Sequence, residues 1–278
     1  MSIFQALILG IIQGLTEYIP VSSTANLILI PWLLGWEFDP AAKEVFVILV
    51  QWGTLVGVVI YFWRDILQIV RAVFSGLAHR QPFETFEARL GWLVVVATVP
   101  AVIAGVFIKS YLEQLYQMYI LISIILMLGG VLMLIAERFG KRTRDLKQMT
   151  WLDAIIVGVW QIFAMIPGFS RSSVTISGGM LRHFTRADAA RFSFLMSIPA
   201  LLGAGVVALK DLFSTPGLLA SLAAPLAVGF LSAAITGYLS IRWLLGYLKA
   251  RSLNAFVVYR FVFGGFCLIV GLLRLASH

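Results

Sequence analysis

The chain has 278 residues, of which 60% are hydrophobic and 12% charged, and its formal net charge is +8. Soluble globular domains are about one quarter charged and less than half apolar, so this composition excludes a soluble cytosolic enzyme, a disordered chain and a nucleic-acid-binding protein. The single cysteine, Cys267, lies in an apolar run, which excludes a disulfide framework and a cysteine-based metal site. We therefore expect an integral membrane protein with a single membrane domain over residues 1–278.

Apolar stretches long enough to cross a bilayer as helices, about 18 residues or more, occur six times. They are 46–63, 90–108, 118–136, 192–209, 217–241 and 254–275. Two shorter apolar runs, 3–15 and 154–166, each lead into a proline and a cluster of hydroxyl residues. Non-helical backbone at membrane depth persists only where protein or water satisfies it, so we interpret these runs as first arms of re-entrant hairpins. The expected fold is an all-α polytopic membrane protein with six transmembrane helices and two re-entrant helical hairpins.

Basic residues are distributed unevenly between the segments that connect these spans. Twelve Lys or Arg against six Asp or Glu occur in 64–89, 137–153 and 242–251. The other connecting segments, 26–45, 109–117 and 210–216, contain three Lys or Arg against five Asp or Glu. The positive-inside rule assigns the basic set to the cytoplasm. We therefore expect both termini to face outward.

The chain contains an internal repeat. Gly10-Ile-Ile-Gln13, followed by Ile19-Pro20 and Ser22-Ser23, resembles Gly158-Val-Trp-Gln161, followed by Ile166-Pro167 and Ser170. The offset is 148 residues at the glutamine and 147 at the proline, and the match continues from Phe46 and Phe192 at an offset of 146. The expected topology gives the two copies opposite orientations, which predicts inverted repeats over approximately 1–136 and 151–275. Such repeats place their site near the bilayer midplane, where broken helices meet.

Both hairpin tips carry polar side chains. The first reads Gln13-Gly-Leu-Thr-Glu17-Tyr-Ile-Pro20-Val-Ser22-Ser23-Thr24-Ala-Asn26, and the second reads Pro167-Gly-Phe-Ser170-Arg171-Ser172-Ser173-Val-Thr175. A helix that restarts beside Arg171 presents free N–H groups and the positive end of its dipole, which together with a guanidinium suit phosphate or pyrophosphate. Hydroxyl groups that only pack helices, and a structural ion pair between Glu17 and Arg171, are the simpler alternatives. The ion pair leaves the hydroxyl groups at both tips unexplained.

These motifs carry a resemblance to a known family. The pattern Gln13…Glu17, the Pro-Val-Ser-Ser-Thr at 20–24 and the Pro-Gly-Phe-Ser-Arg-Ser-x-x-Thr at 167–175 resemble the bacterial undecaprenyl-pyrophosphate phosphatases, the family also associated with bacitracin resistance. The resemblance implies a plasma-membrane hydrolase that converts undecaprenyl pyrophosphate to the monophosphate at the outer face and so recycles the lipid carrier for peptidoglycan and cell-wall synthesis. It also implies a divalent cation, Mg or Ca, and the inverted-repeat fold. The expected partners are polyprenyl pyrophosphate and membrane lipids. A homodimer is compatible with the sequence, and no nucleic acid is expected to bind.

The resemblance and the chemistry together give the candidate site. Catalytic residues are Glu17, Ser23 and Arg171; substrate-binding residues are Gln13, Ser22, Thr24, Asn26, Ser170, Ser172, Ser173 and Thr175; metal ligands are Glu17 and Gln13. Arg171 is expected to hold the pyrophosphate. Ser23 is the preferred nucleophile and Glu17 its base or a metal ligand, while direct attack by water with Glu17 as base is equally allowed.

Two residues leave alternatives open. Members of the family commonly carry a histidine where this chain has Asn26, and asparagine cannot shuttle a proton near neutral pH. A weakened member that serves as a lipid-binding scaffold is therefore one rival function, and a lipid-phosphate transporter or flippase that uses the same inverted-repeat site is another. Arg260, inside the last apolar stretch, either snorkels to the cytoplasmic interface, the favoured interpretation, or faces the cavity.

Overall fold

The computed structural model describes residues 1–213 and 222–277, with side chains described outside 109–113, 204 and 207–213. The regular secondary structure in these ranges is helical, and no β-strand occurs in them. The α-helices are α1 (Ile3–Tyr18), α2 (Ser23–Leu34), α3 (Pro40–Tyr61), α4 (Trp63–Ala78), α5 (Phe86–Glu113), α6 (Tyr119–Phe139), α7 (Trp151–Phe163), α8 (Arg171–Leu181), α9 (Arg186–Phe213), α11 (Ala223–Leu248) and α12 (Asn254–Ala276). Short 3₁₀-helices occupy Gln114–Gln117 and Leu146–Gln148.

Five helices of the described chain are long and apolar enough to cross a membrane. They are α3, the Phe86–Ile108 part of α5, α6, α11 and α12. Each overlaps one of the predicted spans, but α3 begins at Pro40 rather than 46 and α11 ends at Leu248 rather than 241. Residues 217–221 of the predicted span 217–241 lie outside the described residues. The remaining predicted span, 192–209, falls within α9, which is helical but is not one of these five. The prediction of an all-helical membrane protein is thus confirmed.

The two short apolar runs form helices of less than spanning length. The run 3–15 lies in α1, which has 16 residues. The run 154–166 lies in α7, which has 13 residues and ends at Phe163, so its predicted end was three residues too long. Residues 164–166 instead form turns whose N–H groups donate to carbonyls at the end of the helix, as in the bond from Ile166 N to Phe163 O at 3.1 Å. The proline at 167 is the reason, because it cannot continue the helix and restricts the residue before it.

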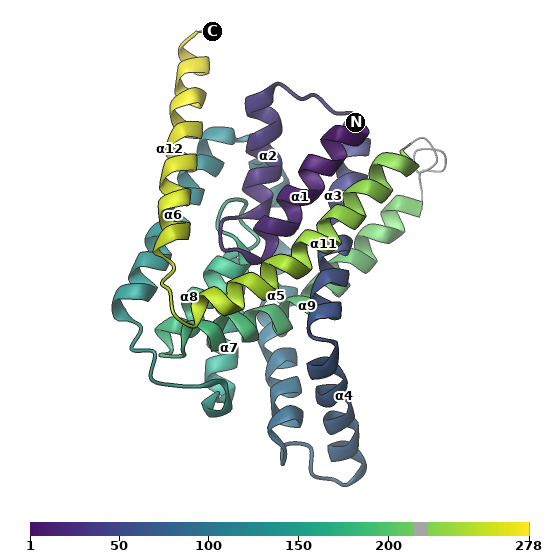
Figure 1. The fold of residues 1–278 in the computed structure, drawn as a ribbon, viewed down its shortest axis with the longest axis vertical. Coiled ribbons are helices and arrows are strands. Elements are labelled where there is room, and N and C mark those ends of the chain that lie inside the picture. The colour runs from purple at the N-terminus through teal and green to yellow at the C-terminus, as the bar shows by residue number, and fades with distance from the viewer. Residues whose placement is uncertain (214–221, 278) are drawn as a thin grey trace.

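Figure 1 shows how the chain is arranged along its long axis. Both termini lie at one end of the molecule, whereas α4 and the start of α5 project from the other end. The basic connections between α6 and α7 and between α11 and α12 lie on the side away from the termini. The segments that are rich in Lys and Arg are therefore gathered away from both chain ends.

The helix α4 was not expected, since segment 64–89 was interpreted only as a basic connection. Its first turn carries Asp65, and its apolar residues recur at helical spacing, so that one face packs on α5. Gly91 of α5 leaves the room for this contact, because a Cβ there would meet methyl groups of Ile69 and Val73 at 2.8 Å. A strongly amphipathic helix of low mean hydropathy escapes a search for apolar spans.

Two crossings at glycine hold the short helices against long ones. A Cβ at Gly10 of α1 would collide with Ser232 of α11 and lie 2.5 Å from the carbonyl oxygen of Gly229. A Cβ at Gly158 of α7 would collide with the carbonyl oxygen of Ala97 in α5. Helices in lipid gain little from the hydrophobic effect between them, so close backbone approach at small residues is what packs them tightly.

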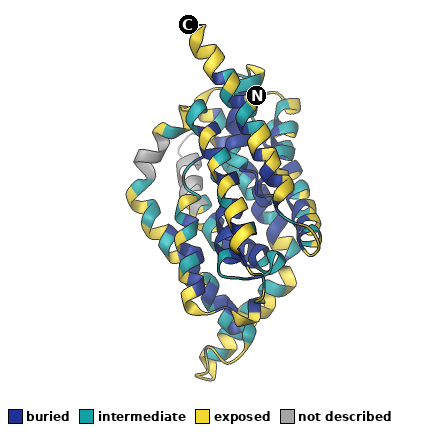
Figure 2. Ribbon diagram, turned by 90° about the vertical axis from the view of Figure 1, so that its left-hand side faces the viewer, coloured by how far each residue is buried: buried dark blue, intermediate teal, exposed yellow. Residues whose placement is uncertain are grey.

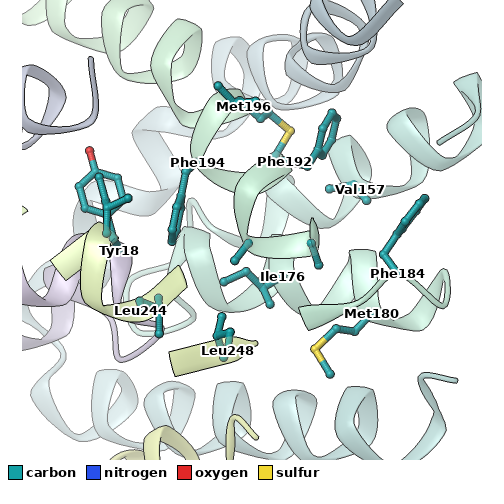
Figure 3. Packing of buried hydrophobic residues seen from close by; sticks show 14 of the residues in the cluster. Tyr18, Val157, Ile176, Met180, Phe184, Phe192, Phe194, Met196, Leu244 and Leu248 are labelled. Carbon is teal, nitrogen blue, oxygen red and sulfur yellow. The ribbon is translucent and has the colours of Figure 1, made fainter. Parts of the chain in front are cut away.

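Buried residues lie mostly inside the bundle and exposed residues on its outside (Figure 2). Many of the exposed residues are large and apolar. Figure 3 shows a large apolar cluster around α8, in which Ile176 and Met180 lie among side chains of α7, α9 and α11. Tyr18 at the end of α1 packs edge-on against Phe194, with ring centroids 5.2 Å apart. This cluster holds α8 in place next to the non-helical segments that follow α1 and α7. Soluble proteins expose mainly polar residues, whereas the outer surface of this protein is apolar and is suited to contact with lipid.

Candidate active site

The first helix break separates α1 from α2 at residues 19–22. Ile19 is extended, with ψ of 129°, as expected before a proline, and Pro20 cannot continue the helix. Ser22 has a φ of 70°, and its hydroxyl oxygen accepts the N–H of Ala25 at 3.3 Å, so it caps α2. The first residue of α2 is therefore Ser23.

The second break, between α7 and α8, ends in the same way. Gly168 has a φ of 112°, a conformation that favours glycine. Ser170 has a φ of 72°, and its hydroxyl oxygen accepts the N–H of Ser173 at 3.4 Å. The first residue of α8 is Arg171. Each break thus delivers one functional side chain at the first position of a helix, immediately after a serine cap.

The two breaks meet at the carboxylate of Glu17. Arg171 forms an ion pair through Nη2 with Oε1 of Glu17. The other oxygen, Oε2, accepts a hydrogen bond from Ser23 Oγ at 2.7 Å and one from Gln13 Nε2 at 2.9 Å. Ser172 Oγ donates to the main-chain carbonyl of Glu17 at 3.2 Å. The three residues predicted to be catalytic are therefore in direct contact, although 154 positions separate Glu17 from Arg171 in the chain.

The N-termini of α2 and α8 lie beside this carboxylate. The first N–H groups of a helix have no acceptor within it, and those of Ser23, Thr24, Arg171 and Ser172 donate to no residue in the described chain. Two helix N-termini therefore present amide donors and the positive ends of their dipoles near Arg171. Such an arrangement binds anions, and it is most suitable for one with several oxygens.

The remaining predicted residues divide into those near Glu17 and those that support the breaks. Thr24 is half-buried and, like Ser23, lies at the start of α2. Ser172 is buried and also contacts the hydroxyl of Ser170, 3.1 Å away. Thr175 lies deeper, between α8 and α9, where its hydroxyl contacts Ser193 Oγ at 2.6 Å. Ser173 lies in the first turn of α8 and is fully buried.

Asn26 lies next to the first break, where it bonds to main chain. Its Nδ2 donates to the carbonyls of Val21 at 3.1 Å and Ser22 at 2.8 Å, and its Oδ1 accepts the hydroxyl of Tyr259. All of the hydrogen-bonding groups of the Asn26 amide are thereby engaged. In this structure the residue shapes the turn that precedes α2.

The favoured sequence interpretation of Arg260, that it snorkels to the cytoplasmic interface, is wrong. Arg260 is fully buried rather than extended toward an interface, and it donates to main-chain carbonyls at both breaks. The available signal was a charge inside an apolar span, which is costly and is usually paired or functional. Sequence spacing did not indicate which side of α12 (Asn254–Ala276) faces the breaks.

The oxygen atoms near Glu17 are of the kind that hard divalent cations prefer. Oε1 of Gln13 is buried and accepts no hydrogen bond from a described residue, and it belongs to the same amide that contacts Glu17. No group of three or more His, Cys, Asp or Glu side chains comes together in the described part of the chain. The residues therefore fit Mg or Ca only where phosphate oxygens and water complete the coordination shell, as is common for Mg²⁺ bound with phosphates.

Comparisons with known proteins identify the family of this chain. The family model described as "Bacitracin resistance protein BacA" matches residues 6–266. A protein of Myxococcus xanthus (strain DK1622) named undecaprenyl-diphosphatase is 44% identical, over 97% of this chain and 89% of its own. Proteins of the same name from Chlorobaculum tepidum and Thermomicrobium roseum are 42% and 40% identical, with 98% of each covered. The motifs that form the site thus occur in a chain that belongs to the BacA family of bacitracin resistance proteins.

Proposed function

We propose that this protein hydrolyses undecaprenyl pyrophosphate to undecaprenyl phosphate and inorganic phosphate, and thereby recycles the lipid carrier of cell-wall synthesis. The observation that carries the proposal is the double engagement of Glu17, whose two oxygens contact a serine hydroxyl and a guanidinium brought in by two separate helix breaks. The relatives named undecaprenyl-diphosphatase supply the substrate class. A nucleophile, a base and an anion-binding cation are the parts that phosphoryl transfer requires.

In the first step, Arg171 and the N–H groups of α2 and α8 bind the pyrophosphate and stabilise the charge on its equatorial oxygens. Ser23 Oγ forms a bond with the terminal phosphorus and its proton passes to Glu17. The bridging P–O bond breaks, and Glu17 gives this proton to the oxygen of the departing undecaprenyl phosphate, which leaves the carboxylate ionised for the second step. Water then attacks the phosphoserine and releases inorganic phosphate, with Glu17 as base. The hydrogen bond of 2.7 Å between Ser23 and Glu17 supports this route, and the same carboxylate can instead activate water for direct attack.

Gln13 and Glu17 are the residues that would hold a divalent cation. Such an ion, when bound, neutralises phosphate charge and polarises the phosphoryl oxygens. The buried Oε1 of Gln13, which has no donor among the described residues, supports this assignment. In this proposal the Glu17 carboxylate serves both as a ligand of the cation and as the proton acceptor.

The membrane arrangement that we propose has six transmembrane helices and two re-entrant hairpins, α1–α2 and α7–α8, in an inverted repeat. Its support is the equivalence of the glycine crossings at Gly10 and Gly158 and of the positive-φ serine caps at Ser22 and Ser170. In each pair the offset is 148 residues. The termini would face outward and the basic connections inward, in keeping with their separation in Figure 1, and the site would open to the outer face.

Phosphate release from undecaprenyl pyrophosphate by detergent-purified protein tests the function. The wild-type protein should release phosphate, and Arg171→Ala should abolish release, whereas Ser75→Ala, an exposed serine on α4 (Trp63–Ala78), should not change it. Movement of the lipid between leaflets without hydrolysis would instead favour a transporter. Wild-type turnover equal to that of Glu17→Ala would favour a lipid-binding scaffold.

A further inference from the structure

The helix α12 contributes a buried cation that contacts both helix breaks. Arg260 has an exposed fraction of 0%, and within the described chain its hydrogen bonds all go to main-chain carbonyls. Nε donates to Pro20 at 2.8 Å in the first break, and Nη2 donates to Phe169 at 2.9 Å in the second. Nη1 donates to Leu126 of α6 at 3.1 Å and to Gly168 at 3.4 Å. The planar guanidinium therefore joins three segments that are distant in sequence.

These carbonyls occupy defined places relative to the reacting groups. Phe169 immediately precedes the serine cap of α8. Because a trans peptide directs its carbonyl and the following N–H in opposite directions, a Phe169 carbonyl held by Arg260 turns the N–H of Ser170 away from Arg260. Pro20 stands three residues before Ser23, so its carbonyl fixes the start of the turn that delivers the serine. Arg260 thus fixes the orientation of one carbonyl in each turn.

The neighbouring residue on α12 extends the same arrangement. The Tyr259 hydroxyl donates to Asn26, whose amide holds the carbonyls of Val21 and Ser22. Arg260 therefore contacts the carbonyl of Pro20 directly, and Tyr259 contacts those of Val21 and Ser22 through Asn26. Ser22 and Ser170 both adopt a positive φ, which costs free energy for a residue other than glycine and persists only where surrounding contacts maintain it.

We propose that Tyr259 and Arg260 form a positioning pair that holds the two breaks in register, so that Ser23 and Arg171 reach Glu17 together. This inference rests on the proposed hydrolysis. Neither residue contacts Glu17, Ser23 or Arg171 through a hydrogen bond in the described chain, so the pair acts through the backbone. Arg260 is suited to this task because its rigid fork can hold several carbonyls in one plane, which a lysine cannot do.

Two adjacent glycines on α6 (Tyr119–Phe139) provide a matched test that leaves Arg260 itself unchanged. A Cβ at Gly129 would collide with Nη1 of Arg260 and lie 3.2 Å from the carbonyl oxygen of Phe169. A Cβ at Gly130 would lie 3.3 Å from the ring of Phe261 and 3.4 Å from Cβ of Arg260. Gly129→Ala must therefore displace the guanidinium, whereas Gly130→Ala adds the same methyl group beside it and leaves the head group free.

The experiment measures kcat, KM and Tm for phosphate release from undecaprenyl pyrophosphate in detergent. A displacement of about 1 Å in a reacting group can reduce rate about 10²-fold, so Gly129→Ala should lower kcat by about that factor and change KM by less than about threefold. Gly130→Ala should keep kcat within about threefold. Arg260→Lys should lower kcat at least about tenfold at nearly unchanged KM, and Tyr259→Phe should lower it about threefold to tenfold.

The pattern of loss separates positioning from folding. A merely structural role would lower the amount of folded protein and Tm and leave kcat per folded molecule unchanged. The inference is overturned if folded Gly129→Ala and Arg260→Lys both retain kcat within about threefold, or if the two glycine variants lose activity equally. If Gly129→Ala does not fold, Arg260→Lys decides the question. If the wild-type protein releases no phosphate, the proposed function fails instead.

Discussion

The ion pair between Glu17 and Arg171 can be tested as structure and as chemistry in the same set of variants. The side chains retain 7% and 16% of their exposure, respectively. Removal of one partner from a buried pair costs about 3–5 kcal/mol, because the other charge remains buried without compensation. Partial exposure places the expected cost near the lower limit, at about 3 kcal/mol, which corresponds to about 6–10 °C in Tm for a chain of this size.

Glu17→Gln and Arg171→Met should therefore each lower Tm by that amount, and the double variant should recover most of the loss, because it leaves no charge unpaired. Activity should behave differently. All three variants should lose at least about 10²-fold in kcat, since a base or an anion-stabilising donor contributes about that much. Differential scanning fluorimetry and phosphate release measure the two quantities on the same samples.

A more exposed ion pair serves as the control. Asp65 and Arg191 lie 2.5 Å apart, with side-chain exposures of 30% and 43%, and such pairs contribute about 0–1 kcal/mol. Asp65→Asn should therefore shift Tm by less than about 3 °C and leave kcat unchanged. The reasoning is wrong if the double variant loses the sum of the two single losses, which means no coupling. It is also wrong if the double variant stays within about tenfold of wild-type activity, which means that the pair is only structural.

Three further outcomes are expected. Ser23→Ala should lower kcat by more than about 10³-fold if the serine is phosphorylated; a loss under tenfold, measured by phosphate release, excludes the covalent route and leaves water as nucleophile. A chelator should abolish release, and Gln13→Leu should raise the Mg²⁺ concentration for half-maximal rate at least about tenfold, whereas an unchanged Mg²⁺ titration removes Gln13 from the metal site. Burial opposes ionisation of Asp153, but hydrogen bonds from Arg144 and Arg182 outweigh it and hold the pKa of that carboxyl well below its ordinary value of 3.8. The ionised carboxyl therefore stabilises the folded protein above about pH 4, and this contribution declines as the pH falls below that. Between pH 6 and pH 3, Tm should therefore fall more for the wild-type protein than for Asp153→Asn, and parallel curves would contradict this.

The sequence was sufficient to predict the helical class and the position of the helix breaks. Proline disfavours a helix for a local reason, the missing N–H and the ring clash, although Pro31, Pro100 and Pro199 lie inside helices. Pro20 and Pro167 each stand beside a cluster of hydroxyl residues, and the two signals together indicated the ends of the short apolar runs. Glu17 and Arg171 could be recognised for a related reason, since an ionisable group in an apolar chain is costly. Their direct contact was one of two alternatives, and the hydrogen bond from the Ser23 hydroxyl to the same carboxylate is the additional feature of the structure.

The contribution of α12 was outside the reach of the sequence. Arg260 contacts carbonyls that lie 91 and 240 positions away, and no local pattern specifies such a contact. Its acceptors are main-chain atoms, which every residue possesses, so residue identities in the breaks give no sign of a partner. The same limit applies to Thr175, which the motif groups with the phosphate-binding residues but which contacts Ser193 on α9. A motif records which residues occur together, whereas the direction of each helix decides which of them face the site.

The two breaks share a scaffold and differ in their chemistry. Each has a serine cap with positive φ followed by the first residue of a helix, and that residue is Ser23 in one and Arg171 in the other. Glu17 stands four residues after Gln13. The equivalent position, four residues after Gln161, is occupied by Met165. Two identical breaks would bring together two hydroxyl groups or two cations, and neither combination offers a nucleophile, a base and an anion-binding group. Hydrolysis at a site formed by two equivalent breaks therefore requires these positions to differ, while the serine caps that direct the backbone remain the same.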